Sequence, residues 1–129
     1  MRRRTTSCDH RHDRGAALLE FVLVLPILVL LVFGVVEFGR GYSARSTIVA
    51  AAREGARVAA VGTGDPVAAV RASAAHVNEV ALNVNVSPSP CVPGDPVTVT
   101  LTYDHDYSIP LYGEGTWTIN ESAVMRCEG

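Results

Sequence analysis

The sequence predicts an α+β protein: a long N-terminal transmembrane helix continues into an amphipathic helix, followed by a short helix and a small antiparallel sheet of about three strands. Three observations indicate this fold class. Residues 16–36 contain a single charge, the helical pattern continues to Val61, and alternating apolar and polar residues recur after residue 81. We expect four regions: a cytoplasmic basic leader (1–15), a transmembrane helix (16–36), an amphipathic extension of that helix (37–61) and a small extracytoplasmic α+β domain (62–129).

The charges are unevenly distributed, although the formal net charge is only −2. Residues 1–15 carry +3, residues 16–61 carry +1 and residues 62–129 carry −6. A basic end before an apolar run is typical of a single-pass protein whose N-terminus stays in the cytoplasm. The basic segment is short and also contains acids, so nucleic acid is not an expected partner.

Residues 16–36 have the length of a membrane-spanning helix, roughly 31 Å at about 1.5 Å per residue. Pro26 and Gly34 fall inside the run, and membrane helices tolerate both residue types. A buried core helix is an alternative, but residues 21–36 offer no polar face to water. A secretory signal peptide is a second alternative. The apolar region of signal peptides is shorter than the one here and ends at an A-x-A-like site, and the residues that follow here, VEFGRGYSARS, contain no such site.

Glu20 is the one charged residue in this run. A carboxylate at the bilayer centre costs roughly 2.5–3.5 kcal/mol on insertion scales. The cost is smaller near a helix start, where unpaired N–H groups carry partial positive charge. If a peptidase cuts between Gly15 and Ala16, Glu20 becomes the fifth residue and can pair with the new α-amino group of its own chain or of a neighbour. Such a pair would set the axial register of packed helices.

The same segment resembles a known family. Arg14-Gly15, followed by four small or apolar residues and then Glu20-Phe21, is similar to the processing site of type IV pilins and pseudopilins, at which the cut falls between Gly15 and Ala16. Residues 14–61 as a whole resemble the TadE-like family of the tight-adherence (Flp) pilus machinery, with LEF at 19–21, LP at 25–26, VEFGR at 36–40 and AAREGAR at 51–57.

The resemblance implies a minor pilin or pseudopilin that either stays in the cytoplasmic membrane or is incorporated in the pilus. It implies three partners: a prepilin peptidase acting at Gly15 and Ala16, other pilin-like subunits and the pilus assembly platform. Glu20 and Phe21 are the residues expected to set the helix register. The alternative is a bitopic envelope protein whose outer domain binds a ligand or a cell-wall component.

The membrane helix is expected to continue to about Val61. At 100° per residue from Tyr42, most polar residues fall within an arc of about 120°, namely Ser43, Ser46, Thr47, Arg53, Glu54 and Arg57. Mostly small apolar residues fill the rest, and Arg45 is an exception. Small side chains allow close helix approach, so the apolar face can pack on other subunits, on the chain's own domain, or on both. Glu37 and Arg40 are expected to pair near the outer membrane boundary.

The outer domain is expected to begin with a helix over 66–81, in which Asp65 is the cap and Pro66 the first residue. Strands are expected over 82–86, 97–104 and 117–127. We expect a proline-rich loop between the first two and a loop over 107–115 between the last two. The alternation slips near Asn120 and Glu121, which predicts a β-bulge there.

Cys91 and Cys127 both fall in the outer domain, where an oxidising compartment favours a disulfide. The bond would close a loop of about 37 residues, worth on the order of 3–4 kcal/mol in the chain-entropy model. Two free thiols are the alternative. Cys8 lies in the leader.

No motif points to catalysis, and we expect a protein that is not an enzyme and that uses no cofactor, metal ion or small-molecule substrate. Asp104-His105-Asp106 suggests a metal site, but neighbouring strand residues point to opposite faces, so we expect a turn at the strand end instead. Asp9, His10, His12 and Asp13 lie in a leader with no fold to preorganise a site. Asn85 and Asn120 begin glycosylation sequons, which are common by chance.

Overall fold

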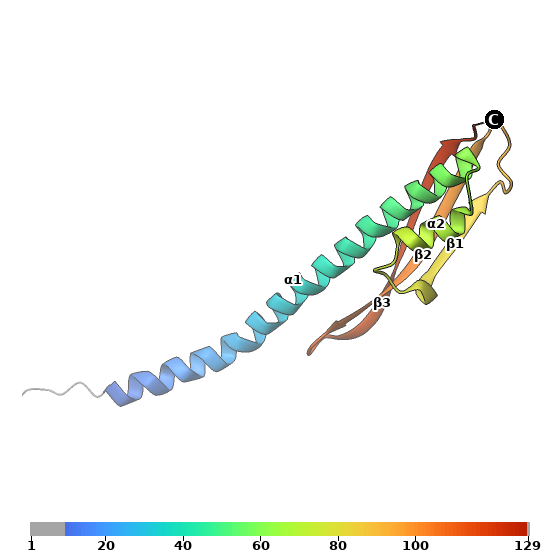
Figure 1. The fold of residues 1–129 in the computed structure, drawn as a ribbon. Coiled ribbons are helices and arrows are strands. Elements are labelled where there is room, and N and C mark those ends of the chain that lie inside the picture. Colours follow the sequence, from blue (N-terminus) through green and yellow to red (C-terminus); the bar gives the residue numbers. More distant parts are fainter. Residues whose placement is uncertain (1–9, 129) are drawn as a thin grey trace, which may run out of the picture.

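The computed structural model describes residues 10–128 and shows one long helix with a small domain packed along its C-terminal half (Figure 1). The α+β fold class is confirmed. The elements in chain order are α1 (His10–Val61), α2 (Pro66–Ser73), the 3-10 helix η1 (Glu79–Ala81), β1 (Leu82–Ser87), β2 (Pro96–Ile109) and β3 (Gly113–Arg126).

Helix α1 is continuous over 52 residues, or about 78 Å at 1.5 Å per residue. The expected single helix to Val61 is confirmed, and it ends where Gly62 takes a φ of +68° and donates its N–H to the Val58 carbonyl at 3.0 Å. Its start lies earlier than expected, because the last residues of the expected leader already belong to the helix. The rest of the leader, with Cys8 and Asp9, lies outside the described residues.

Helix α2 begins as expected and ends early. The Asp65 carboxylate accepts the N–H of Val67 at 2.9 Å, and Pro66 occupies the first turn. The helix nevertheless stops at Ser73, so the prediction of a helix to residue 81 was wrong. The apolar spacing does continue, but the Asn78 side chain accepts the N–H of Val80 at 3.1 Å, a local bond that competes with helical pairing and starts η1 instead.

The three strands form one antiparallel sheet in the order β1-β2-β3. β1 pairs with β2 from Leu82 opposite Tyr103 to Ser87 opposite Thr98. β2 and β3 form a long hairpin whose register is unbroken over fourteen pairs, with Ile109 opposite Gly113 at its closed end. All three expected strands are present, and the hairpin is longer than expected.

The loop expected over 107–115 was wrong, because both strands extend into it and leave only residues 110–112 as the turn. Gly113 and Gly115 suggested turns, yet Gly115 lies in β3 directly opposite Tyr107. A Cβ at Gly115 would meet the ring and hydroxyl of Tyr107. An aromatic side chain lying over a cross-strand glycine compensates for the missing side chain, and this explains why the strand persists.

The bulge expected near Asn120 and Glu121 is also absent from the hairpin, whose register runs through both residues. The alternation slips because Glu121 is a charged residue on the face that packs on α1. Its carboxylate accepts a hydrogen bond from the Arg45 guanidinium at 2.8 Å, so the helix supplies the counter-charge.

The core lies between α1 and one face of the sheet. β2 contributes alternating buried side chains to this core, and α1 contributes mainly small ones: Val97, Val99, Leu101 and Tyr103 from β2, and Ala44, Ile48, Ala51, Ala52 and Ala56 from α1. The opposite face of the sheet carries polar side chains that pair across the strands, for example Thr102 with Asn120 at 2.9 Å. The apolar face of the helix extension therefore packs on the chain's own domain.

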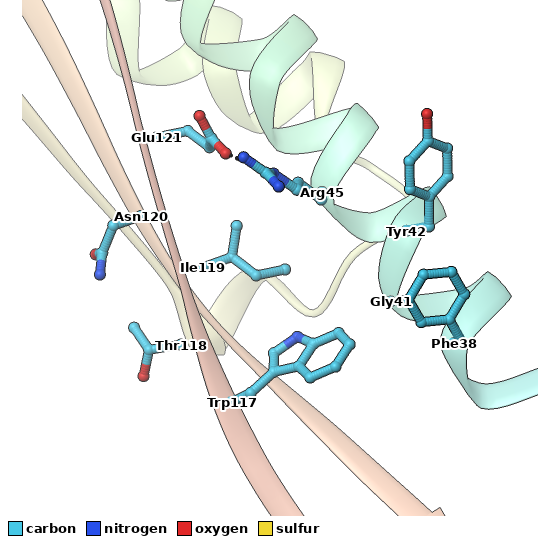
Figure 2. Close-up of a pocket in the computed structure, with 9 residues that line it drawn as sticks. All are labelled: Phe38, Gly41, Tyr42, Arg45, Trp117, Thr118, Ile119, Asn120 and Glu121. Carbon is cyan, nitrogen blue, oxygen red and sulfur yellow. Dashed lines mark hydrogen bonds and ion pairs between the residues drawn. The ribbon is translucent and has the colours of Figure 1, made fainter. Parts of the chain in front are cut away.

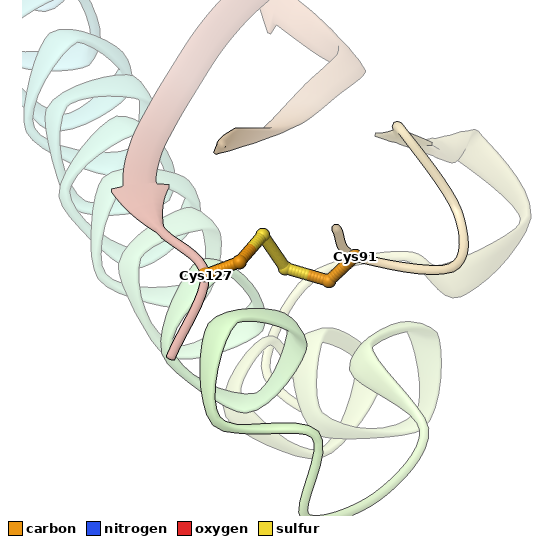
Figure 3. The surroundings of a disulfide bond; sticks show 2 residues. All are labelled: Cys91 and Cys127. Atoms are coloured by element: carbon orange, nitrogen blue, oxygen red, sulfur yellow. A yellow bond between two sulfur atoms is a disulfide. The ribbon is translucent and has the colours of Figure 1, made fainter. Parts of the chain in front are cut away.

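The expected disulfide between Cys91 and Cys127 is present, with Cα atoms 5.9 Å apart and a sequence separation of 36 (Figure 3). It joins the proline-rich loop to the residue that follows β3. Backbone bonds hold this junction: Gly94 N–H donates to the Cys127 carbonyl at 3.1 Å, and Glu128 N–H donates to the Ala60 carbonyl at 2.9 Å. The end of the described chain is thereby fixed to the last turn of α1.

Candidate functional site

The N-terminal half of α1 exposes large apolar side chains on all sides, in an almost continuous series from Leu18 to Phe38. Within residues 10–128, α1 is the one helix long and apolar enough to cross a membrane, and none of its most apolar window is buried in the chain. Exposing so many contiguous apolar side chains to water is unfavourable, which suggests that this half of the helix anchors the chain in a membrane; we call it the anchor.

The four residues expected to act in processing and register lie on this anchor. Gly15, Ala16, Glu20 and Phe21 are all exposed, at the far end of α1 from the sheet (Figure 1). The helix runs through the Gly15–Ala16 bond without a break. Their roles in processing and helix register stay predictions.

At the other end of the anchor, α1 and the β2–β3 hairpin enclose a cleft of about 420 Å³, which we call the juxtamembrane cleft. Its lining brings the last turns of the apolar helix together with the closed half of the hairpin: Gly34, Glu37, Phe38, His105, Tyr107, Ile109, Tyr112, Thr116 and Trp117. The hairpin thus reaches back along α1 to the level of Gly34, inside the segment expected to span the membrane.

Trp117 and Phe38 separate this cleft from a second opening of about 490 Å³, shown in Figure 2. The Trp117 indole points at α1 where Gly41 leaves space, because a Cβ at Gly41 would meet the ring. On the other side of the opening lies the Arg45–Glu121 ion pair. Gly41 in the helix therefore positions the aromatic residue that closes the cleft.

The juxtamembrane cleft contains a buried Glu–His pair. Glu37 Oε2 accepts a hydrogen bond from Arg40 at 3.3 Å, which confirms the expected local pair. Glu37 Oε1 lies 3.8 Å from His105 Nε2, which is too far for a hydrogen bond. Neither of these two atoms has another partner among the described residues, and both side chains are about nine-tenths buried.

This arrangement can bind a small hydrogen-bonding group, because Glu37 Oε1 and His105 Nε2 both lack a hydrogen-bond partner among the described residues. His105 also lies beside two aromatic rings, with centroid distances of 5.6 Å to Trp117 and 6.2 Å to Tyr103. The buried carboxylate of Glu37 and the buried imidazole of His105 thus form a polar site at the boundary between the anchor and the outer domain.

The Asp104-His105-Asp106 segment lies within β2, so the turn expected there was wrong. Its side chains alternate, as strand geometry requires: His105 faces α1, whereas Asp104 and Asp106 lie on the exposed face. There they accept hydrogen bonds from Thr118 at 2.6 Å and from Thr116 at 2.8 Å. In the described part of the chain no cluster of three or more metal-ligating residues occurs.

Sequence reasoning considered His105 only in a metal site that it set aside, and it did not identify Trp117 as a site residue. The signal was available for His105, because it continues by one step the inward series Val97, Val99, Leu101 and Tyr103. The pairing of His105 with Glu37 could not be foreseen, since the two residues are far apart in sequence.

The exposed polar arc of the helix extension is also as expected, with Arg53 and Arg57 facing outward. Arg57 donates two hydrogen bonds to the Glu54 carboxylate, at 2.6 and 3.0 Å. These bonds, more than the accompanying charge attraction, lower the pKa of Glu54, and they raise the pKa of Arg57.

The family model described as TadE-like protein matches residues 15–57. No curated protein and no solved structure matches the chain. The matched segment covers one third of the chain and lies entirely within α1, so it includes Glu20, Glu37 and the Glu54–Arg57 pair but none of the sheet. The resemblance of this helix to TadE-like proteins is thereby confirmed, and it suggests a role in tight-adherence pilus assembly.

Proposed function

We propose that this chain is a TadE-like minor pilin or pseudopilin that takes part in assembling tight-adherence (type IVb, Flp-type) pili. Its role is structural and not enzymatic. It acts through helix packing in and outside the membrane, with other pilin-like subunits and with the pilus assembly platform. The observation that carries the proposal is the TadE-like match over residues 15–57. The matched segment lies in a helix whose N-terminal half exposes apolar side chains on every side.

The continuity of α1 supports this role. One unbroken helix carries both the apolar anchor and the face on which the outer domain packs. A force or displacement applied to the anchor is therefore transmitted directly to the outer domain. A flexible linker between anchor and domain would not couple the two in this way.

The processing step follows from the basic leader and the Gly15–Ala16 junction. A prepilin peptidase would remove residues 1–15 on the cytoplasmic side and leave Ala16 as the new N-terminus. Glu20 would then lie about one helical turn from a free α-amino group. Pairing between them, within one subunit or between two, would set the register of neighbouring helices.

The N-terminus of the membrane-extracted protein tests the processing step. We expect the mature chain to begin at Ala16 by N-terminal sequencing and intact mass. Gly15→Leu should leave the precursor uncut, whereas Gly39→Leu should be processed normally; both glycines have open space around the Cβ position, so neither change crowds the fold. A wild-type protein that keeps Met1 in piliated cells would refute the processing step and favour a simple bitopic anchor.

Piliation tests the register role of Glu20. Glu20→Ala should leave membrane insertion intact, because it removes a charge from an apolar helix, and should impair pilus assembly. Glu79→Ala is the matched control, since it removes an exposed carboxylate from η1 outside the anchor. Normal pili on cells that carry Glu20→Ala as their only copy would remove the register role.

A further inference from the structure

The closed end of the β2–β3 hairpin exposes apolar side chains that have no partner in the outer domain. In the hairpin tip, residues 109–113, Leu111 is 81% exposed and Tyr112 is 76% exposed. The turn is held by the Tyr112 N–H, which donates to the Ile109 carbonyl at 3.1 Å. Single exposed apolar residues are common, but two adjacent ones at a projecting tip indicate a contact surface.

The backbone of the tip strengthens this point. Leu111 has a φ of +69°, in the left-handed region that glycine or asparagine occupies readily and that a branched apolar residue rarely adopts. A leucine here costs turn stability and gains no burial within the chain. Strain of this kind at an exposed position indicates that the side chain serves a contact outside the fold.

The position of the tip identifies the contact. Ile109 and Tyr112 line the juxtamembrane cleft together with Gly34 of α1, so the tip lies beside the last turns of the apolar anchor (Figure 1). Exposed apolar side chains of α1, including Phe33 and Val36, lie at the same level. Once the anchor is in the bilayer, the surface nearest to the tip is the outer lipid interface.

The residues around the tip have the distribution found at a membrane interface. Tyr112, Trp117 and Phe38 are exposed aromatic residues that line the cleft beside the tip, as in the aromatic belts of membrane proteins. Polar side chains begin at the strand pair next to the tip, where the Ser108 hydroxyl donates a hydrogen bond to the Glu114 carboxylate at 3.3 Å.

We infer that the hairpin tip inserts Leu111 and Tyr112 into the outer interface of the membrane that α1 spans. The outer domain is then held by two points, the anchor and the tip, which restricts the tilt of α1 and of the domain packed on it relative to the membrane. Lipid also covers the open side of the juxtamembrane cleft, which keeps the Glu37–His105 pair away from bulk water. This inference rests on the membrane placement of α1 and does not depend on a role in pilus assembly.

The chain contains a single tryptophan, which makes a fluorescence test possible. Trp117→Phe combined with Tyr112→Trp moves the reporter to the tip. The full-length protein is reconstituted at low protein-to-lipid ratio in phosphatidylcholine–phosphatidylglycerol vesicles. We expect blue-shifted emission, strong quenching by lipids brominated near the upper acyl chain, and protection from aqueous iodide.

Adding Leu111→Asn to the reporter protein should reduce the bromolipid quenching and increase the iodide quenching. Asparagine tolerates a positive φ, so this change should leave the hairpin intact or stabilise it. Val80→Asn is the matched control, because Val80 is 96% exposed and lies away from the tip in η1. It should leave both kinds of quenching unchanged.

The outcomes separate the possible failures. A reporter that is fully open to iodide in protein that floats with the vesicles would overturn the inference and leave the anchor intact. Protection that appears only at high protein-to-lipid ratio would also overturn it, because the tip would then contact a second copy. Protein that fails to float with the vesicles would overturn both the tip contact and the membrane placement of α1.

Discussion

Gly55 lets the outer domain dock on α1, and Gly55→Ala tests that docking directly. Gly55 is buried in α1 beside α2 and the sheet. A Cβ added there would overlap Val70 Cγ2, and it would lie 3.4 Å from Val99 Cγ1 and 3.5 Å from the Pro66 carbonyl oxygen. Val70 and Val99 are themselves fully buried, so neither can rotate into free space.

Two effects of this substitution oppose each other. Alanine in place of a helical glycine stabilises a helix by about 0.5–1 kcal/mol. Overpacking a filled core costs about 1–3 kcal/mol. Together the two effects lower the free energy of unfolding by between zero and about 2.5 kcal/mol. In a domain of this size, each kcal/mol lowers the unfolding midpoint by about 4–8 °C. We therefore expect Gly55→Ala to lower the midpoint.

Gly39→Ala is the matched control, because Gly39 lies in the same helix with open space around its Cβ position. That change should leave the unfolding midpoint unchanged or raise it slightly. The assay is thermal unfolding of the full-length protein in detergent, followed by near-UV circular dichroism. A second mutation, Val70→Ala, should offset part of the loss at Gly55, since it removes the methyl group that clashes. If Gly55→Ala raised the midpoint as much as Gly39→Ala, the close packing of α1 against α2 would be refuted.

Three further changes test the ion pairs and the disulfide. Replacing Cys91 and Cys127 by serine should lower the free energy of unfolding by about 3–4 kcal/mol, as measured by denaturant titration, because the 36-position loop is no longer closed; an unchanged midpoint under non-reducing conditions would contradict this. Glu37→Leu should leave the thermal midpoint unchanged or raise it, because it removes a buried carboxylate oxygen that has no partner among the described residues, and the bond to Arg40 that is also lost joins Glu37 to an exposed side chain; a large drop would show that the carboxylate stabilises the fold. Arg57 lowers the pKa of Glu54 in the folded state, so the Glu54–Arg57 pair stabilises the fold above the unfolded pKa of Glu54, and this stabilisation is lost as the pH falls through the folded pKa. The difference in thermal midpoint between wild type and Glu54→Gln should therefore shrink in acid. A difference that grows in acid would contradict the direction of the pKa shift.

The parts of the fold that follow from local patterns could be predicted from the sequence. The apolar length of α1, its end at Gly62 and the alternation through Val97, Val99 and Leu101 each depend on neighbouring residues alone. The disulfide could be inferred as well, because only two cysteines fall in the outer domain. These features need no knowledge of which distant segments meet.

The errors in the hairpin and at the candidate site involve partners on other strands or on α1, whereas the early end of α2 goes with a local bond of Asn78. Gly115 suggested a loop until Tyr107 was placed opposite it, and Glu121 suggested a bulge until Arg45 was placed beside it. The Glu37–His105 pair, the polar part of the candidate site, joins the end of the anchor to the middle of β2. Local periodicity cannot supply such pairings, because they arise only when the hairpin is laid along the helix.

The packing of the sheet on α1 restricts where other subunits can bind. Small residues in the helix extension suggested close contact between subunits, but Ala51, Ala52 and Ala56 are already buried under the chain's own domain. A neighbouring subunit that packed on the helix extension would meet the polar arc with Arg53 and Arg57, and such exposed charges contribute little to tight packing. Within the membrane every side of the helix is open. Close helix packing between subunits is therefore to be sought along residues 16–36, the part of α1 that carries Glu20.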